Sequence, residues 1–372
     1  MLSSQKEFLC LFGWDDFFES HIDIQSPNLV SSFLYPARVI CEEKNLYRVQ
    51  LGLNDVRWAS VSGKMQFYAV NRADYPAVGD WVLVEAPDQA DRGVIQRICN
   101  RRSIIYRKQV GSNADMQILS TNVDYVFITT SLNDELNYRR IERYLAVAWD
   151  SGATPVILLT KSDIYSEKVV DALSDARCEF PNVDIHAISK NDFEKEFFFR
   201  EYLKEGKTSI VIGSSGVGKS TLVNFLIGEE QIKTQNVRES DGKGRHTTTS
   251  RSLYVSRYGG LIIDTPGMRE LQLSDHIEGV SVQFSDIESL IAKCRFSDCQ
   301  HQTEPNCKIR EALADDSLSA ERWKSYQKLA AEVRHAKRKQ NKELTAEDRK
   351  IWKKISISAR NKTHQKKGTP NE

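Results

Sequence analysis

Nine consecutive residues have the types and spacing of a phosphate-binding loop. Positions 213–221 read GSSGVGKST, which satisfies the pattern G-x-x-x-x-G-K-[ST] in full. Glycines let backbone N–H groups approach phosphate oxygens, and a helix starting at the loop directs its positive dipole end at the same charge. Lys219 is expected to reach the β- and γ-phosphates, and Ser220 to bind magnesium. The nucleotide-contacting residues predicted here are Gly213, Ser214, Ser215, Gly216, Val217, Gly218, Lys219, Ser220 and Thr221.

A second element suited to phosphate and magnesium follows about 45 residues after Lys219. The sequence Asp264-Thr-Pro-Gly267 ends an apolar run, so Asp264 is expected at a strand end, where it could hold magnesium through water. The Gly267 amide could meet the γ-phosphate. The intervening polar, glycine-rich segment 242–249 (GKGRHTTT) is typical of a mobile switch. One of its threonines at 247, 248 and 249 is expected to complete the magnesium shell; Thr248 represents this open choice.

A candidate base-reading element precedes the phosphate loop. Thr160-Lys161-Ser162-Asp163 ends the apolar run PVILL, and an aspartate there can accept two hydrogen bonds from guanine N1 and N2. Adenine lacks this donor pair, so Asp163 favours guanine over the adenine alternative. Thr160 departs from the usual asparagine, which weakens the motif. A second base-contacting loop is expected at AISK (187–190), with Ser189 as its contact.

Three cysteines and one histidine lie within 14 residues near the C-terminal end. Their spacing is Cys294-x4-Cys299-x-His301-x5-Cys307. Zinc favours this soft tetrahedral set, and four protein ligands leave no open position for chemistry, so we expect one structural zinc per chain. The alternative is a group of unliganded thiols.

The elements that must position these residues change character along the chain. From residue 36 to 103 the pattern indicates about five short strands: two around 43–45, a further pair in WASVSGKMQFYAV about 62–63, then DWVLVEA and GVIQRICNR. This favours a small barrel, with an OB-fold as the leading candidate over another small β-domain. After about residue 118, strands alternate with helices. VDYVFITT, TPVILLT and SIVIG are expected as strands, 138–152 as a helix, and 251–267 as a β-hairpin in a largely parallel sheet.

Charge is segregated although the net charge is only +1. From residue 308 to the end, 18 Lys/Arg stand against 9 Asp/Glu, which is +9; the remaining residues therefore sum to −8. Such a basic arm suits a polyanion, RNA first, although a solvated helix face is the alternative. The apolar runs are too short for a membrane span, and the N-terminal residues lack the pattern of a signal peptide. We therefore expect a cytoplasmic protein with no membrane association.

The order of the motifs is unusual, because the base motif comes before the phosphate loop, the switch and DTPG. With a barrel before it and a Cys/His cluster after it, this circularly permuted order resembles the small ribosomal subunit biogenesis GTPases, the RsgA or YjeQ/YloQ family. The resemblance covers roughly 36–335. Besides the motifs above, it includes the GDW at 79–81 and Asn122-Val-Asp124.

The resemblance implies a ribosome-stimulated GTPase of late 30S maturation that binds 16S rRNA and converts GTP to GDP; a monomer is expected. The implied architecture is multidomain: an extension (1–35), an OB-fold barrel (36–106), a circularly permuted α/β GTPase domain (107–276), an α-helical zinc-binding domain (277–340) and a basic tail (341–372). We have no functional interpretation of the extension.

Catalysis has one gap in the sequence. Ras-like GTPases place a water-orienting glutamine just after DxxG, whereas this chain has Met268. His246 in the switch is the best internal candidate, as the resemblance also implies, with a solvated loop histidine as the alternative. Two rival classes are a metabolic P-loop kinase, which would need neither zinc domain nor basic tail, and an RNA-binding scaffold with a vestigial nucleotide site. The intact Lys219, Ser220 and Asp264 oppose the scaffold.

Overall fold

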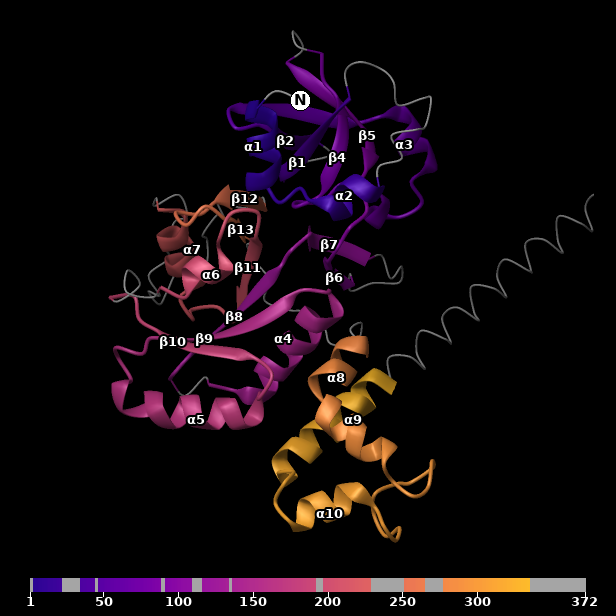
Figure 1. Ribbon diagram of the computed structural model, residues 1–372, viewed down its shortest axis with the longest axis vertical. Helices are drawn as coiled ribbons and strands as arrows, with labels where there is room; N and C mark the ends of the chain where they lie inside the picture. Colours follow the sequence, from indigo (N-terminus) through magenta and orange to yellow (C-terminus); the bar gives the residue numbers. More distant parts are fainter. Residues whose placement is uncertain are drawn as a thin grey trace, which may run out of the picture. The chain divides into compact units, whose positions relative to one another are not determined.

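A computed structural model shows a barrel, an α/β domain and a C-terminal helical unit, in chain order (Figure 1). The predicted fold class is thereby confirmed. The structure describes residues 3–21, 34–43, 46–87, 91–108, 116–133, 136–191, 197–228, 251–264 and 277–334. These fall into two compact units: the barrel and the α/β domain with α8 form one, and the helices from Asp286 onward form the other. Among the described residues, no helix is long and apolar enough to cross a membrane.

Five strands close the barrel in the order β1-β2-β3-β5-β4, with β4 pairing back to β1. The β3–β5 pair is parallel and the other pairs are antiparallel, which is the OB-fold arrangement. Alternate side chains such as Val39, Val49 and Ala59 point into its apolar core. The strands are β1 (Leu34–Glu43), β2 (Leu46–Gly52), β3 (Asp55–Val61), β4 (Trp81–Glu85) and β5 (Arg92–Ile98).

One predicted strand of the barrel is wrong. The segment after Ser62 forms the helix α3 (Gly63–Tyr68), followed by the 3-10 turn η2 (Arg72–Asp74). The Ser62 hydroxyl accepts the Met65 N–H, which caps the new helix and stops β3 from continuing into a hairpin. Instead of pairing with the segment that follows it, β3 pairs in parallel with β5, which comes later in the chain.

The α/β domain is a six-stranded layer in the order β10-β9-β8-β11-β13-β12, parallel except for β12. Side chains alternate between two apolar layers, one packed on α4 and α5 and the other on α6 and α7, so both sheet faces are covered. The predicted hairpin is β12–β13. The elements are β8 (Tyr125–Ser131), α4 (Tyr138–Asp150), β9 (Thr154–Thr160), η3 (Ser166–Lys168), α5 (Val169–Glu179), β10 (Asp184–Ile188), α6 (Phe199–Tyr202), β11 (Thr208–Gly213), α7 (Lys219–Ile227), β12 (Ser252–Val255) and β13 (Leu261–Asp264).

The N-terminal extension packs onto the joint between these domains. Its helices α1 (Ser3–Leu11) and α2 (Asp16–His21) bury Phe8 and Phe18 against Trp81 of the barrel, and Phe12, just after α1, packs on Phe8. A Cβ on Gly13 would lie 2.6 Å from the Gly206 carbonyl oxygen, so the extension touches the α/β domain through backbone. Residues 3–21 therefore complete the core at the joint.

The GDW and Asn-Val-Asp sequences meet at the same joint. Asn122 donates from Nδ2 to the Gly79 carbonyl at 3.0 Å, and Gly79 has φ +96° with no room for a Cβ against Thr121. Asp80, fully buried, accepts from the Ala77 N–H and from two nitrogens of Arg101. Both motifs thus hold the barrel against the α/β domain. A short hairpin, β6 (Ile104–Lys108) with β7 (Met116–Thr121), connects the two domains.

Arg38 of β1 lies at the centre of this joint and is almost fully buried. It donates to the carbonyls of Phe12 and Asn122 and to the Thr208 hydroxyl, so one guanidinium links the extension, the barrel and the α/β domain. Burial lowers its pKa to about 10. The arginine therefore stays charged at neutral pH.

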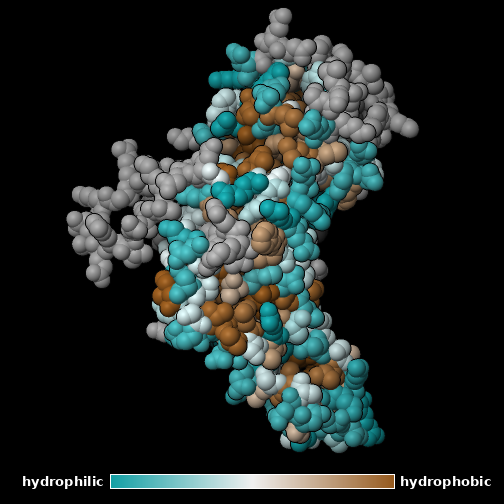
Figure 2. Space-filling model, turned by 60° about the vertical axis from the view of Figure 1, so that its left-hand side comes forward, coloured by the Kyte–Doolittle hydropathy of each residue, from teal (hydrophilic) through white to brown (hydrophobic). Residues whose placement is uncertain are grey.

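The C-terminal unit is a small helical body with a mostly hydrophilic surface in the view of Figure 2. Its helices are α9 (Ser285–Ala292), α10 (Lys308–Ala314) and a further helix over 320–334, as expected for short helices around the cysteine cluster; α8 (Ile277–Gln283) precedes them. Arg322 makes two 3.0 Å bonds to Asp286, and Tyr326 donates to Glu288 at 2.9 Å, which ties the last helix to α9. The basic tail beyond 334 lies outside the described residues.

Candidate functional site: a nucleotide site and a metal centre

The motifs converge because their strands end at one edge of the parallel sheet. Pairing places Thr160 of β9 opposite Ser131 of β8 and Ile188 of β10. Gly213 of β11 pairs with Thr129 of β8, two residues before the end of that strand. The carboxyl edge of an open α/β sheet is where such folds bind ligands, so strand order brings the base motif and the phosphate loop together.

The phosphate loop needs its glycines. Gly213 has φ +147°, and a Cβ there would lie 2.2 Å from the Thr129 carbonyl oxygen. Gly216 and Gly218 also have positive φ, at +81° and +99°, and α7 begins immediately after Gly218. Lys219 Nζ donates to the carbonyl of Gly213 at 2.8 Å and to that of Ser214. The lysine therefore crosses the loop at its first turn, and the helix N-terminus points into it.

Thr160 supplies a direct link between the two nucleotide loops. It is buried, and its hydroxyl oxygen lies 2.7 Å from the Val217 carbonyl and 3.2 Å from the Thr130 carbonyl. The hydroxyl donates to the phosphate loop from the end of β9. The departure from asparagine thus leaves a side chain that still holds the base motif against the phosphate loop.

The rest of the base motif is exposed or half-buried at the end of β9. Lys161 adopts φ +63°, which turns the chain out of the strand, and the Ser162 N–H donates to the Ile188 carbonyl. The Asp163 carboxylate accepts from Asn191 Nδ2 at 2.9 Å. Ser189 is buried and accepts the Asn191 N–H at 3.0 Å. Asn191 therefore joins the two base loops.

Helix α4 also reaches the phosphate loop. Arg140 donates from Nη1 to Ser214 Oγ at 2.7 Å, and the Tyr144 phenol, one turn further along the same helix, lies beside Ser214. Burial raises the pKa of Tyr144, while Arg140 and the bond to Ser214 oppose this rise. Arg140 thereby holds Ser214 from outside the loop.

The switch and the last three residues of DTPG lie outside the described residues. Asp264 ends β13, on the far side of β11 from β8, as the sequence predicts for a strand end. The predicted catalytic His246, the threonines at 247, 248 and 249, Gly267 and Met268 lie outside the described residues. Their roles stay predictions.

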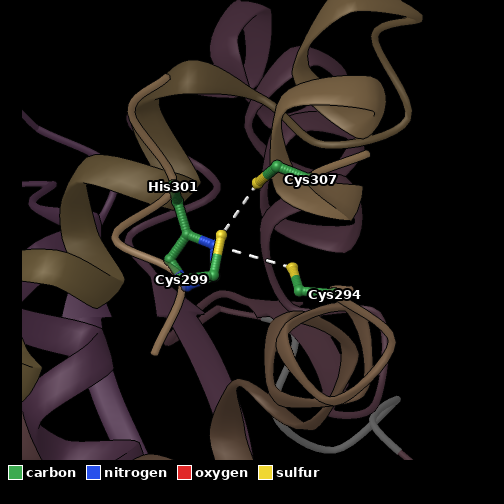
Figure 3. A group of neighbouring side chains, drawn as sticks. All are labelled: Cys294, Cys299, His301 and Cys307. Atoms are coloured by element: carbon green, nitrogen blue, oxygen red, sulfur yellow. Dashed lines mark hydrogen bonds between the residues drawn. The ribbon is translucent and has the colours of Figure 1, made fainter. Parts of the chain in front are cut away.

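The predicted metal ligands do come together (Figure 3). The four ligand atoms of Cys294, Cys299, His301 and Cys307 lie within 4.8 Å of one another. His301 Nδ1 is 3.7 Å from Cys294 Sγ and 3.4 Å from Cys307 Sγ. Tetrahedral zinc with bonds of about 2.3 Å to sulfur and 2.0 Å to nitrogen would separate such atoms by about 3.6 Å. The cluster could therefore hold a metal ion.

Local backbone structure shapes this cluster. Cys294 follows α9, while Cys307 is the N-cap of α10. Between them the Glu304 carboxylate accepts the N–H groups of Gln300, Gln302 and Thr303. The backbone hydrogen bonds, that of Gln300 first, lower the pKa of Glu304 to about 2. The Glu304 carboxylate therefore stays ionised.

Three functional contacts escaped sequence reasoning. Asn191, Arg140 and Tyr144 each contact a motif residue but belong to no motif themselves. Asn191 carried a weak signal, because it follows the predicted Ser189–Lys190 loop directly. Arg140 carried none, since its partner Ser214 is 74 residues away.

Comparison with known proteins agrees with the geometry. The family model described as RsgA GTPase matches residues 98–274, and one described as 50S ribosome-binding GTPase matches 208–344. The crystal structure of YjeQ from Thermotoga maritima superposes with a TM-score of 0.60, covering 81% of this chain and 98% of that one. Its sequence identity is 24%, so this likeness shows the fold alone.

Sequence relatives are closer. A protein of Oceanobacillus iheyensis named Small ribosomal subunit biogenesis GTPase RsgA 1 is 45% identical over 324 residues, 86% of this chain and 91% of that protein. Its namesake RsgA from Opitutus terrae is 40% identical over 356 residues, 93% and 95% of the two chains. With the permuted motif order and the barrel, these matches show that the chain belongs to the RsgA GTPase family and is a GTP-hydrolysing enzyme.

Proposed function

We propose that this GTPase acts in late maturation of the small ribosomal subunit, binds 16S rRNA on the 30S particle, and hydrolyses GTP rapidly only there. The observation that carries the proposal is similarity along nearly the whole chain, barrel and metal cluster included, to proteins named for small ribosomal subunit biogenesis. The protein would act as a monomer in the cytoplasm.

In this proposal different site residues contact the base, the phosphates, the magnesium ion and the attacking water. Asp163 reads guanine and is oriented by Asn191, while Lys161, Ser162 and Ser189 line the base. Lys219 and the loop amides hold the phosphates. Ser220, Asp264 and a switch threonine hold magnesium, which neutralises charge on the β- and γ-phosphates. His246 orients the attacking water.

The barrel offers a surface suited to single-stranded RNA. Arg48 of β2 pairs with Trp58 of β3, with its guanidinium 5.9 Å from the ring centroid, and Trp58 pairs on its other side with Arg92 of β5. Their neighbours Val49 and Ala59 face the core, so these three side chains face outward. An aromatic ring between two arginines supports base stacking with phosphate contacts. Trp58→Ala should weaken binding to 30S subunits.

We also propose that the Cys/His cluster holds one structural zinc. The donor set of three sulfurs and one imidazole nitrogen, and separations close to those of a tetrahedral site, support zinc over harder ions. The ion would clamp a unit whose core is small.

The experiment that tests the proposal is phosphate release from GTP and from ATP, each with and without purified 30S subunits. Slow GTP turnover that rises strongly with 30S subunits is expected, with none in Lys219→Ala. ATP turnover equal to that of GTP would favour the kinase class. No turnover of either nucleotide would favour the scaffold class. Unchanged GTP turnover with 30S subunits at low salt would contradict the ribosomal role.

A further inference from the structure

Two cationic side chains converge on the first turn of the phosphate loop. Lys219 donates to the Ser214 carbonyl, and Arg140 donates to the Ser214 hydroxyl at 2.7 Å. Lys219 comes from α7, within the loop motif, whereas Arg140 comes from α4, which precedes the loop by about 70 residues. Ser214 is therefore hydrogen-bonded both by a residue of the loop motif, Lys219, and by a residue of another helix, Arg140.

The position of Ser214 identifies which part of the nucleotide this second cation serves. The lysine of a G-x-x-x-x-G-K-[ST] loop serves the β- and γ-phosphates. Because its ammonium group lies within hydrogen-bond distance of the Ser214 carbonyl, Ser214 belongs to that end of the loop. A guanidinium on the Ser214 hydroxyl adds positive charge at the end of the loop that serves the β- and γ-phosphates, and GTP differs from GDP in the γ-phosphate.

The grip on Ser214 also restricts its side chain. Arg140 can only donate, so the Ser214 oxygen accepts from it. Asn137 caps α4 and accepts the Arg140 N–H at 3.2 Å, which fixes the backbone under the arginine. The N-terminal turn of the helix therefore fixes where the Arg140 side chain starts toward the loop.

We propose that Arg140 is a positioning residue of the GTPase reaction, which holds the first turn of the phosphate loop through Ser214 and raises the preference of the site for the triphosphate. The inference rests on the GTPase activity of the family and not on the ribosomal role. The N-terminal end of α4, which lies before the base motif in the permuted order, thereby becomes part of the phosphate site.

The test compares Arg140→Ala with Arg139→Ala, the exposed neighbouring arginine on the same helix, in the full-length protein without ribosomes. Arg140→Ala should raise KM for GTP and weaken a non-hydrolysable GTP analogue about tenfold, while GDP binding weakens less than about threefold, since the lost charge acts mainly on the γ-phosphate. Thermal unfolding should not shift, because Arg140 is exposed. Arg139→Ala should behave like wild type.

A double-mutant cycle tests whether the effect passes through Ser214. In a Ser214→Ala background, Arg140→Ala should cost no more than about threefold, because the contact is already lost. Arg140→Lys should restore part of the GTP preference, since it keeps the charge without the planar fork. Equal losses of GTP and GDP in Arg140→Ala, or effects that multiply in full with Ser214→Ala, would overturn the proposal. Both results are independent of whether 30S subunits stimulate turnover.

Discussion

Replacing Thr160 with valine tests whether the base motif and the phosphate loop are one unit. Valine keeps the shape of the side chain and removes the hydroxyl that lies 2.7 Å from the Val217 carbonyl. The buried Val217 carbonyl then loses this hydrogen-bond donor, and an unsatisfied buried acceptor lowers stability by about 1–3 kcal/mol. The free energy of unfolding should fall by this amount. If the base motif and the phosphate loop separate while the protein stays folded, part of this free energy is lost from nucleotide binding instead. The affinity then falls about tenfold for each 1.4 kcal/mol.

The assay is denaturant unfolding together with titration of a fluorescent GTP analogue. Thr160→Ser is the matched control, because it keeps the hydroxyl and loses only a methyl group, for which a cost of about 1 kcal/mol is expected. Nucleotide binding by the serine variant should stay close to wild type. If valine and serine weaken the nucleotide equally, the hydroxyl link is irrelevant to the site and the reasoning fails.

Three further predictions concern base selection, the metal and a buried ion pair of the barrel. Asp163→Asn should weaken GTP and admit xanthosine nucleotides, which titration of both would reveal; equal wild-type affinity for GTP and ATP would refute guanine reading. Cys299→Ser should lose zinc by elemental analysis and unfold residues 286–334 while nucleotide binding persists, with exposed Cys178→Ser as control; a full zinc complement in the Cys299 variant would show that the ligand set is wrong. Asp80→Ala should lower the free energy of unfolding by about 3–5 kcal/mol, because it leaves the Arg101 charge uncompensated, whereas Asp55→Ala breaks a more exposed pair and should cost about 1 kcal/mol or less. Equal costs for the two variants would show that the buried pair stabilises the fold no more than the exposed one.

The parts of the fold that were predictable from sequence are those in which short-range pattern and structure coincide. Apolar runs such as 125–131 and 208–213 are buried on both faces of a parallel sheet, so their composition alone indicated strands. The segment after Ser62 was wrongly predicted as a strand, because MQFYAV has strand-like composition. The segment forms α3 instead, capped by the Ser62 hydroxyl, and its exposed Phe67 and Tyr68 gave no core pattern to correct the prediction.

The N-terminal extension shows a different limit. Its sequence gave no functional interpretation, and its helices α1 and α2 are too short to be stable alone. They are held by aromatic packing on Trp81 and by the Gly13–Gly206 approach, contacts with residues more than sixty and almost two hundred positions away. No local pattern encodes such partners.

The chemistry of this protein could be predicted from its sequence. The phosphate loop, the base motif and the Cys/His cluster each lie within 14 consecutive residues or fewer, so their spacing can match the phosphates, the guanine edge or a tetrahedral ion directly. The contacts that join these pieces are found only in the folded chain: Thr160 to Val217, Asn191 to Asp163, and Arg140 to Ser214. The reason is physical, because parallel strands bring the ends of distant segments to one edge of the sheet. A hydrogen bond across that edge depends on strand order and register, which no single segment contains.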